Sequence, residues 1–457
     1  MVKNINVNLS ALKKNSNYYL YLILAIIFNS YISFDNISFD LYFNYRYVAY
    51  SNFFKTLDFS VFHDNYSTFP IWGYGLIHLL GSNKLLFLII QQVFTFLTLI
   101  YFDSQILKFQ LIKRIETFRL IIILSSPWFL FHTQMWEKSI SSNLLILGLL
   151  ILFNFLKTNR FKYLILSSII FGVLSNFRSD YNYLYIVFFI LIITNDKLDL
   201  KKITKKLIFP LTILLLLTPW MLFTYKQTDK PLLTSTNSGH VFLIGLGQLP
   251  NNSWGITPRD DDKIMDYMLR EKFGANYESF NYKEDKYLKS KFKELITKNP
   301  MEWVKKCFYA FKLLLLDPFY IGNVGDFQRN NFSNVEEIRE LEKLAYNLDI
   351  NKGLKLIKTT KWELRKKEVF QLIFTFLVKF QGIVLIFSFF ISLFLCLYKF
   401  GFNLLKDKLV LLFLLTVGYQ ISISVFAFHM PVYNNTIYLI YLLLTYLFFQ
   451  KYLSIKQ

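Results

Sequence analysis

The stretch that decides the fold is residues 369–398, VFQLIFTFLVKFQGIVLIFSFFISLFLCLY, in which Lys379 is the only charged side chain. A helix needs about 20 such residues to cross about 30 Å of hydrocarbon, since each residue advances it by about 1.5 Å. Similar runs lie at residues 18–34, 85–101 and 207–223. Because backbone groups in lipid must pair within the protein, these continuous Leu, Ile and Phe runs predict membrane-spanning helices rather than alternating barrel strands.

The overall composition supports the same interpretation. The 457 residues are 54% hydrophobic and 18% charged, whereas a soluble chain carries about 25% charged residues. The formal net charge is +20, but the lysines mostly flank apolar runs, and no nucleic-acid-binding motif accompanies them. Cys307 and Cys396 lie far apart and suggest neither a CxxC metal site nor a disulfide framework. We therefore expect a membrane protein with no nucleic-acid partner.

The apolar runs predict an all-α polytopic bundle that crosses the membrane about ten or eleven times, with short helices in its external loops. Lys13 and Lys14 precede the first run and predict a cytoplasmic N-terminus. Further spans are predicted at residues 120–131, 139–156, 163–177 and 181–194. Basic connectors at residues 108–119, 157–162 and 197–206 then fall on the cytoplasmic side.

Polar segments divide the chain into four regions. Residues 1–225 form an N-terminal transmembrane module with an acidic first external loop at 35–83, and residues 226–302 form a large external loop. Residues 303–368 contain a short helix, either a span or an interfacial helix, and a polar basic segment, and residues 369–457 complete the bundle. We favour an external position for residues 317–368, because Lys451 and Lys456 then fall inside.

The first external loop offers two candidate catalytic residues, Asp35 and Asp40. Both follow the first predicted span, at the boundary between membrane and water. A carboxylate there is placed to act as general base on an acceptor hydroxyl, provided that its pKa and reach suit the task. The competing interpretation is that an Asp at a helix end is solvated or caps the helix.

This loop resembles the first loop of the GT-C glycosyltransferases, a superfamily that includes the protein O-mannosyltransferases and the lipid A aminoarabinose transferases. The resemblance rests on the acidic residue after the first helix, a stretch containing Tyr and Ala, and a Pro at the start of the second hydrophobic region. The residues concerned are Asp40, Tyr45, Tyr47, Ala49, Pro70, Trp72, Gly73 and Tyr74. The usual family motif is Asp-Glu, whereas Leu41 follows Asp40 here. The resemblance therefore leaves both Asp35 and Asp40 as candidates for the base.

Two later turns match the layout of that superfamily. The resemblance implies that Glu137, between the third and fourth predicted helices, is a second acidic residue facing the same cavity. Arg178 and Asp180 lie in the next external turn, where a guanidinium can bind a phosphate or sugar carboxylate by two parallel hydrogen bonds. The competing interpretation of Arg178 and Asp180 is a local ion pair at the membrane edge.

Residues 236–256 are similar to the start of the large external loop in bacterial polyprenyl-phosphate-sugar transferases. Glycines there allow close approach of a ligand, while amide and indole side chains offer hydrogen bonds and a stacking face. The candidate substrate-binding residues are His240, Gln248, Asn251 and Trp254. A structural role competes for His240, because no second His lies nearby. The run Asp260 to Asp262 makes a divalent cation possible, although such runs are usually solvated.

A basic cluster within residues 358–367 would lie outside, next to the membrane. Lys361, Arg365 and Lys366 are placed there to hold the phosphate of a lipid-linked donor. The competing interpretations are a solvated helix face and an inverted local topology.

The resemblance implies a glycosyltransferase of the bacterial inner membrane that builds cell-envelope glycan. It would move a sugar from a polyprenyl-phosphate donor to a lipid, glycan or protein acceptor on the extracytoplasmic face, with Asp35 or Asp40 as base. One alternative is an O-antigen polymerase or ligase, which uses Arg and His in external loops. The other is a transporter or flippase of lipid-linked sugars, for which charged or broken mid-membrane helices and repeated halves are expected.

Overall fold

The computed structural model describes residues 16–28, 55–56, 84–133, 137–195, 200–277, 281–319, 335–346, 349–363 and 366–453. Within these ranges the regular secondary structure is helical, and no strand is present. The all-α prediction is thereby confirmed for the described part of the chain.

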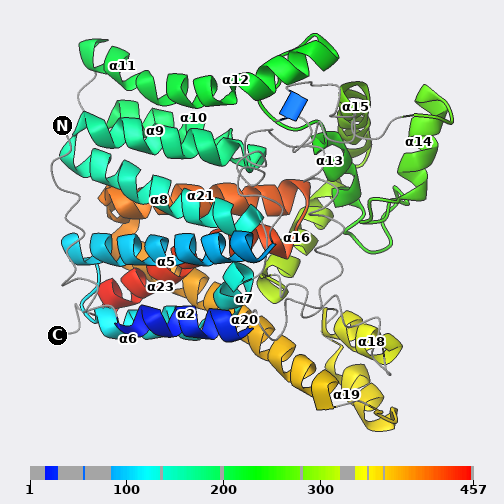
Figure 1. Cartoon of the computed structure of the whole chain (residues 1–457). Helices are drawn as coiled ribbons and strands as arrows, with labels where there is room; N and C mark the ends of the chain where they lie inside the picture. Colours follow the sequence, from blue (N-terminus) through cyan, green and yellow to red (C-terminus); the bar gives the residue numbers. More distant parts are fainter. Residues whose placement is uncertain are drawn as a thin grey trace.

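The body of the protein is a bundle of long helices that lie side by side with their axes roughly aligned (Figure 1). Short connections join several neighbours, so that these helices run antiparallel. The bundle helices are α2 (Ser16–Phe28), α5 (Lys84–Lys108), α8 (Glu137–Thr158), α9 (Phe161–Ser175), α10 (Leu184–Thr194), α12 (Ile208–Thr228), α20 (Lys366–Phe400), α21 (Lys408–Ser422) and α23 (Tyr438–Leu453).

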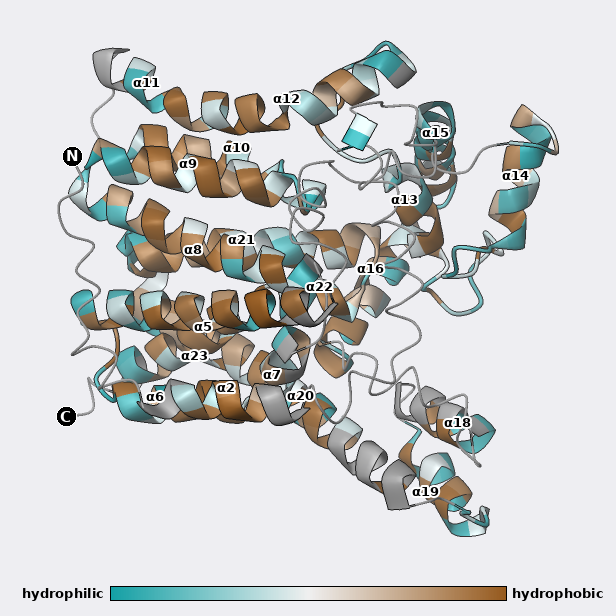
Figure 2. Cartoon of the chain, viewed as in Figure 1, coloured by the Kyte–Doolittle hydropathy of each residue, from teal (hydrophilic) through white to brown (hydrophobic). Residues whose placement is uncertain are grey.

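Among the described residues, four helical stretches are long and apolar enough to cross a membrane. They are Lys138–Thr158, Ile203–Lys226, Thr375–Lys406 and Lys408–Ala427, and shorter apolar helices run over Phe161–Ser175, Leu184–Thr194 and Tyr438–Lys451. Hydrophobic residues dominate the bundle helices, while hydrophilic residues gather toward their ends (Figure 2). These stretches indicate a membrane protein; the count of ten or eleven crossings stays a prediction.

The run predicted as one helix at residues 120–131 is divided in two. It contains the end of α6 (Ile115–Leu124) and most of α7 (Ser126–Thr133), with Ser125 between them. Proline is tolerated in the first turn of a helix but not in its interior, so a new helix begins just before Pro127. The Oε1 atom of Gln381 on α20 accepts hydrogen bonds from the backbone N and the hydroxyl of Ser126, at 2.9 and 2.7 Å. This contact holds the junction between α6 and α7 against α20.

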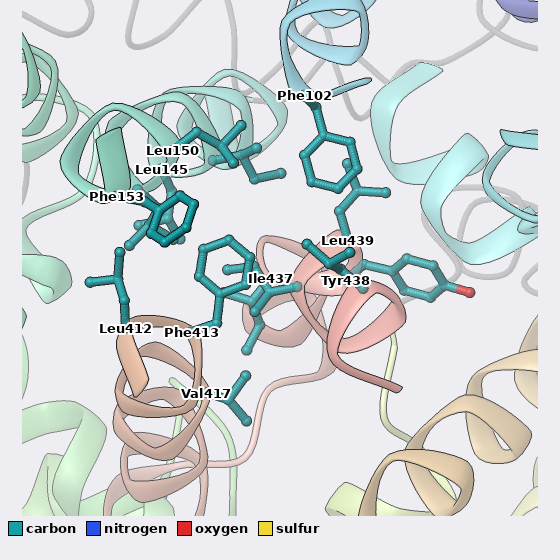
Figure 3. Close-up of a cluster of buried hydrophobic side chains, with 14 of the residues drawn as sticks. Phe102, Leu145, Leu150, Phe153, Leu412, Phe413, Val417, Ile437, Tyr438 and Leu439 are labelled. Carbon is teal, nitrogen blue, oxygen red and sulfur yellow. The ribbon is translucent and has the colours of Figure 1, made fainter. Parts of the chain in front are cut away.

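Apolar side chains from four helices interlock in the centre of the bundle (Figure 3). Phe102 of α5 and Phe153 of α8 lie with Phe413 of α21 and Leu439 of α23, and all four are essentially inaccessible. Lipid is as apolar as these side chains, so their contribution comes from close van der Waals packing rather than from removal from water.

One buried ion pair lies inside the bundle. Arg119 of α6 donates from Nε to Oδ1 of Asp103 at 2.9 Å and from Nη2 to Oδ2 at 2.6 Å. The two side chains are 3% and 2% exposed. Glu116, one turn before Arg119, takes a third contact at 2.5 Å but is itself 68% exposed. The pair ties α5 to α6.

Shorter, more polar helices form a layer at one end of the bundle, opposite α11 (Leu200–Lys206) (Figure 1). They are α13 (Ser238–Leu246), α14 (Lys263–Phe273), α15 (Tyr282–Lys298), α16 (Pro300–Leu316), α18 (Val335–Tyr346) and α19 (Ile350–Thr359). We call this set the end layer. A second small core stabilises α13 to α15, formed by Leu243, Ile244, Leu246, Trp254, Ile256, Met265, Leu269 and Leu288. Residues from the predicted large loop and from the segment at 317–368 thus lie at the same end.

Candidate functional site

The candidate site surrounds Tyr433 on the short helix α22 (Pro431–Asn435). The guanidinium carbon of Arg178 lies 4.7 Å from the centroid of the Tyr433 ring, and Nζ of Lys138 lies 5.9 Å from it. Arg178 is also 5.4 Å from the ring centroid of Tyr181. Cations at these distances interact favourably with aromatic faces. We call this group, with Asp180, the Tyr433 site.

Arg178 is held by a two-point contact with Asp180. Its Nε donates to Oδ1 at 2.9 Å and its Nη2 donates to Oδ2, and the side chains are 6% and 29% exposed. Burial lowers the pKa of the guanidinium, but the Asp180 carboxylate, together with Tyr181 and Tyr433, more than offsets this and holds the pKa above its usual range. The buried Nη1 of Arg178 has no hydrogen-bond partner among the described residues. The predicted ion pair therefore exists, and it leaves one buried donor for another group.

The turn that carries Arg178 is fixed at both ends. Helix α9 ends at Ser175 because the side chain of Asn176 competes for its backbone, donating to the Gly172 carbonyl at 2.7 Å. After Asn176 the backbone of Arg178 is extended and leads into the short helix η4 (Ser179–Tyr181). The hydroxyl of Tyr419 donates to the backbone carbonyl of Asp180, and the Tyr181 hydroxyl lies 2.6 Å from Oγ1 of Thr436. Side chains from distant helices thus position the guanidinium.

His240 and Asp260 form a hydrogen-bonded pair in the end layer. The Nε2 atom of His240 lies 3.0 Å from Oδ1 of Asp260, and the His side chain is 10% exposed against 84% for the Asp. This hydrogen bond lowers the pKa of Asp260. Burial raises the pKa of Tyr433, Arg178 lowers it, and the carboxylates of Asp180 and Asp260 raise it further. Both carboxylates are therefore within electrostatic range of the phenol.

The position of His240 depends on how α13 begins. Oδ1 of Asp285, on α15, accepts from the backbone N of Gly239 at 2.6 Å and from the Ser238 hydroxyl at 3.2 Å. A carboxylate at a helix N-terminus satisfies open N–H groups and complements the helix dipole. A Cβ added at Gly239 would lie 2.4 Å from the Asp285 carbonyl oxygen, so only glycine allows this approach. His240 is thereby fixed in the first turn of α13.

The other substrate-binding candidates from residues 236–256 have structural surroundings. Gln248 donates from Nε2 to the His429 carbonyl and accepts from the His429 backbone N, both at 2.9 Å, which ties the end layer to the segment before α22. Trp254 is 8% exposed in the small core, so the predicted sugar-stacking face is covered by protein. Asn251 has a φ of 54° and forms an exposed turn. Of these four, His240 is linked to the Tyr433 site through Asp260, whose carboxylate is within electrostatic range of the phenol.

The acidic run after residue 259 does not converge on a cation. Asp262 caps α14: it accepts from the Met265 backbone N at 2.8 Å and from the backbone N and hydroxyl of Thr257, both at 2.7 Å. Asp260 instead contacts His240, and Asp261 is exposed. Within the described ranges no group of three or more His, Cys, Asp or Glu side chains is arranged to hold a metal ion. These side chains do not fit the divalent cation that the run made possible.

The remaining candidates are placed as follows. Lys361 is 90% exposed and lies 3.3 Å from Glu363, just after α19, which lies apart from α13 to α15 (Figure 1). Lys366 begins α20, and Glu137 begins α8 directly before Lys138. The side chains of Lys366 and Glu137 are outside the described part of the protein, as are Arg365, Asp35 and Asp40 altogether.

Sequence reasoning did not single out residues 431–436. They form α22 and its end, and Asn434, Asn435 and Thr436 are completely buried. The Asn434 amide donates to the Pro318 carbonyl at 2.9 Å, and the Ser142 hydroxyl donates to the Thr436 carbonyl at 2.8 Å. The available signal was the run of hydrogen-bonding side chains from Asn434 to Thr436, directly before an apolar helix. Polar side chains that are buried must form hydrogen bonds, so such a run indicates a buried polar network.

A buried lysine joins α16 to the end of α21. Nζ of Lys306 donates to the carbonyls of Ala427 at 2.6 Å and Val425 at 2.9 Å, at the π-helical turn η7 (Ile423–Ala427) that follows α21. Such a turn leaves carbonyls without intrahelical partners, and the ammonium group satisfies two of them. Burial lowers the pKa of Lys306 to about 8.

This lysine predicts a pH dependence of stability. An unfolded lysine has a pKa of about 10.4, so above pH 8 the unfolded chain binds more protons than the folded one. Stability should therefore rise between about pH 8 and 10, by at most about 1.4 kcal/mol per pH unit. We expect Lys306→Met to remove this rise in thermal unfolding scans of detergent-solubilised protein. The exposed neighbour Lys305 provides the matched control, Lys305→Met, and an identical pH profile in both variants would contradict the assignment.

Comparisons with known proteins identified no relative: no protein-family model, no curated protein and no solved structure matches this chain.

Proposed function

We propose that the protein is a membrane glycosyltransferase of the GT-C type, which transfers a sugar from a polyprenyl-phosphate donor to a lipid, glycan or protein acceptor outside the cytoplasm. The observation that carries the proposal is the buried guanidinium of Arg178, whose Nη1 lacks a partner among the described residues. Arg178 lies where apolar bundle helices meet the polar end layer. A lipid-linked phosphate is an anion that must reside at such a boundary.

The proposed chemistry is a displacement at the anomeric carbon of the sugar. The acceptor hydroxyl forms the new bond to this carbon, while the bond from the carbon to the phosphate oxygen breaks and the phosphate keeps the electron pair. Arg178 and Lys138 stabilise the charge that develops on the leaving phosphate, since a buried, fixed guanidinium acts strongly there. The rings of Tyr433 and Tyr181 pack against the guanidinium of Arg178 and hold it in place. Asp35 or Asp40, in the first loop, takes the hydroxyl proton.

A second candidate is an enzyme similar to O-antigen polymerases and ligases. The observation in its favour is that Arg178 packs on the Tyr433 ring, while Asp260, which is paired with His240, is within electrostatic range of the same tyrosine, although 62 positions separate Arg178 from His240 in the sequence. In that enzyme class, Arg and His in external loops carry the reaction. Asp35→Asn and Asp40→Asn would then retain activity, whereas His240→Gln would lose it.

The test uses the full-length protein in proteoliposomes with a polyprenyl-phosphate hexose labelled in the sugar. Transfer of the label to an added lipid or glycan acceptor, with stoichiometric release of polyprenyl phosphate, would support a glycosyltransferase. Assaying Asp35→Asn, Asp40→Asn and His240→Gln under the same conditions separates the two enzyme classes. Movement of the labelled lipid across the bilayer without any transfer would instead identify a flippase and reject both enzyme proposals.

A further inference from the structure

A cavity of about 770 Å³ lies between α6, α20 and α23, within the volume range of small-molecule binding pockets. Its shaft is lined by apolar side chains, among them Ile121 of α6, Leu385 of α20 and Leu442 of α23. Lys113, Arg114 and Gln450 lie at one end, and Ser125, Gln381 and Tyr438 lie at the other. We call it the α6–α20–α23 groove.

The groove opens to the side of the bundle. Leu124, Phe380 and Val384 line it and are also 62%, 54% and 46% exposed, so they form its outer edge. Both α20 and α23 carry the apolar composition of membrane helices over this stretch. A ligand can therefore enter from the hydrocarbon without crossing water.

The length of the groove corresponds to one leaflet. Tyr438 and Gln450 line its two ends on the same helix, α23. At about 1.5 Å per residue their separation along the helix is about 18 Å. Half of a bilayer core of about 30 Å is about 15 Å. A chain that lies in the groove would thus span one leaflet, with its polar end beside Lys113 and Arg114.

Two cations lie at that polar end, and the structure holds their backbone in place. The backbone N of Lys113 donates to Oε1 of Gln450 at 3.0 Å, and the Tyr446 hydroxyl donates to the Arg114 carbonyl at 3.4 Å. Both cationic side chains are exposed. The nearby carboxylate of Glu116 contacts Arg119 instead. Among the described residues, no ion pair involving Lys113 or Arg114 is present, so their charge faces the mouth of the groove.

We propose that the α6–α20–α23 groove binds one anionic phospholipid, with an acyl chain along the apolar shaft and the phosphate at Lys113 and Arg114. The charge of the two cations selects an anionic headgroup, and the length of the shaft selects a chain from the adjacent leaflet. The site lies on different helices from the Tyr433 site and does not depend on the proposed sugar transfer. It would stabilise α6 against α20 and α23.

The test measures lipid retention by native mass spectrometry of the full-length protein released from detergent. Phosphatidylglycerol and phosphatidylcholine with identical chains are added in turn, and we expect phosphatidylglycerol to bind about tenfold more tightly or better. The double variant Lys113→Gln with Arg114→Gln should lose this preference. Arg160→Gln with Lys162→Gln removes two exposed cations elsewhere and should keep it. Equal binding of both lipids, or equal effects of both double variants, would overturn the proposal.

Two further measurements identify the ligand. Ser388→Phe adds a ring to the shaft and should weaken phosphatidylglycerol binding, while a thermal unfolding scan confirms that this variant is folded. Dihexanoyl phosphatidylglycerol, which has the same headgroup on short chains, should bind at least tenfold more weakly than the long-chain lipid. Preferential displacement of phosphatidylglycerol by polyprenyl phosphate would show that the groove belongs to an isoprenoid carrier, and would reject the phospholipid.

Discussion

Replacing Arg178 with Ala is expected to reduce sugar transfer about 100-fold to 1,000-fold, the usual cost of losing a buried group that stabilises developing negative charge. The loss should appear in kcat, because the leaving phosphate gains charge only as the bond to the sugar breaks. Arg178→Lys keeps the charge but loses the planar two-point contact with Asp180, so its activity should be intermediate. Initial rates over a range of donor concentrations separate kcat from KM.

The control for this experiment is an arginine of the end layer that also forms an ion pair. Arg270 contacts Asp266 at 2.8 Å but is 54% exposed, so Arg270→Ala should leave transfer unchanged. Because Arg178→Ala leaves Asp180 without its cation, the double variant with Asp180→Ala tests whether misfolding causes the loss. If the double variant unfolds like the wild type and retains full activity, Arg178 does not contact the donor phosphate.

Replacing Asp103 with Leu is expected to lower the free energy of unfolding by about 3–5 kcal/mol, since it leaves a charged guanidinium inside the bundle. The carboxylate of Glu116, which contacts Nη1 of Arg119 at 2.5 Å, is 68% exposed and therefore compensates the buried charge poorly. The pair Asp103→Leu with Arg119→Met removes both charges, and we expect it to recover most of the lost stability. Thermal or denaturant unfolding in one detergent measures the series.

Glu116→Gln is the matched control, because it removes the exposed carboxylate of the same cluster and should cost less than about 1 kcal/mol. An Asp103→Leu protein as stable as Glu116→Gln would show that the buried pair contributes nothing to the bundle. The experiment also bears on the lipid groove, since Arg119 holds α6, which forms one of its walls. We expect Asp103→Leu to weaken phosphatidylglycerol retention as well.

Sequence reasoning succeeded where local composition is sufficient. The predicted runs at residues 85–101, 139–156 and 163–177 correspond to α5, α8 and α9 to within a few residues at most ends. The division between α6 and α7 at Ser125 was not predicted, although Pro127 indicated it, because the surrounding residues are as apolar as those of a continuous span. Apolar character alone locates helices, and backbone chemistry decides where they end.

For the candidate site the sequence singled out Arg178, Asp180 and His240. Arg178 packs on the Tyr433 ring and pairs with Asp180, while His240 holds Asp260, whose carboxylate is within electrostatic range of the same tyrosine. Sequence reasoning assigned Gln248 and Trp254 to the substrate, whereas one binds the His429 backbone and the other packs in a core. An amide or an indole side chain looks the same in the sequence whether it binds a substrate or packs inside the protein. Its surroundings alone distinguish ligand binding from packing.

The sequence by itself determined that this is a helical protein with apolar stretches long enough for a membrane, because each such helix satisfies its backbone within its own segment. Only the tertiary structure decided that Tyr433 lies between Lys138 and Arg178, and that Lys113 and Arg114 lie at the mouth of a groove. Those contacts join residues up to several hundred positions apart. They depend on which faces of the helices pack together, and apolar runs with little periodicity do not specify that choice.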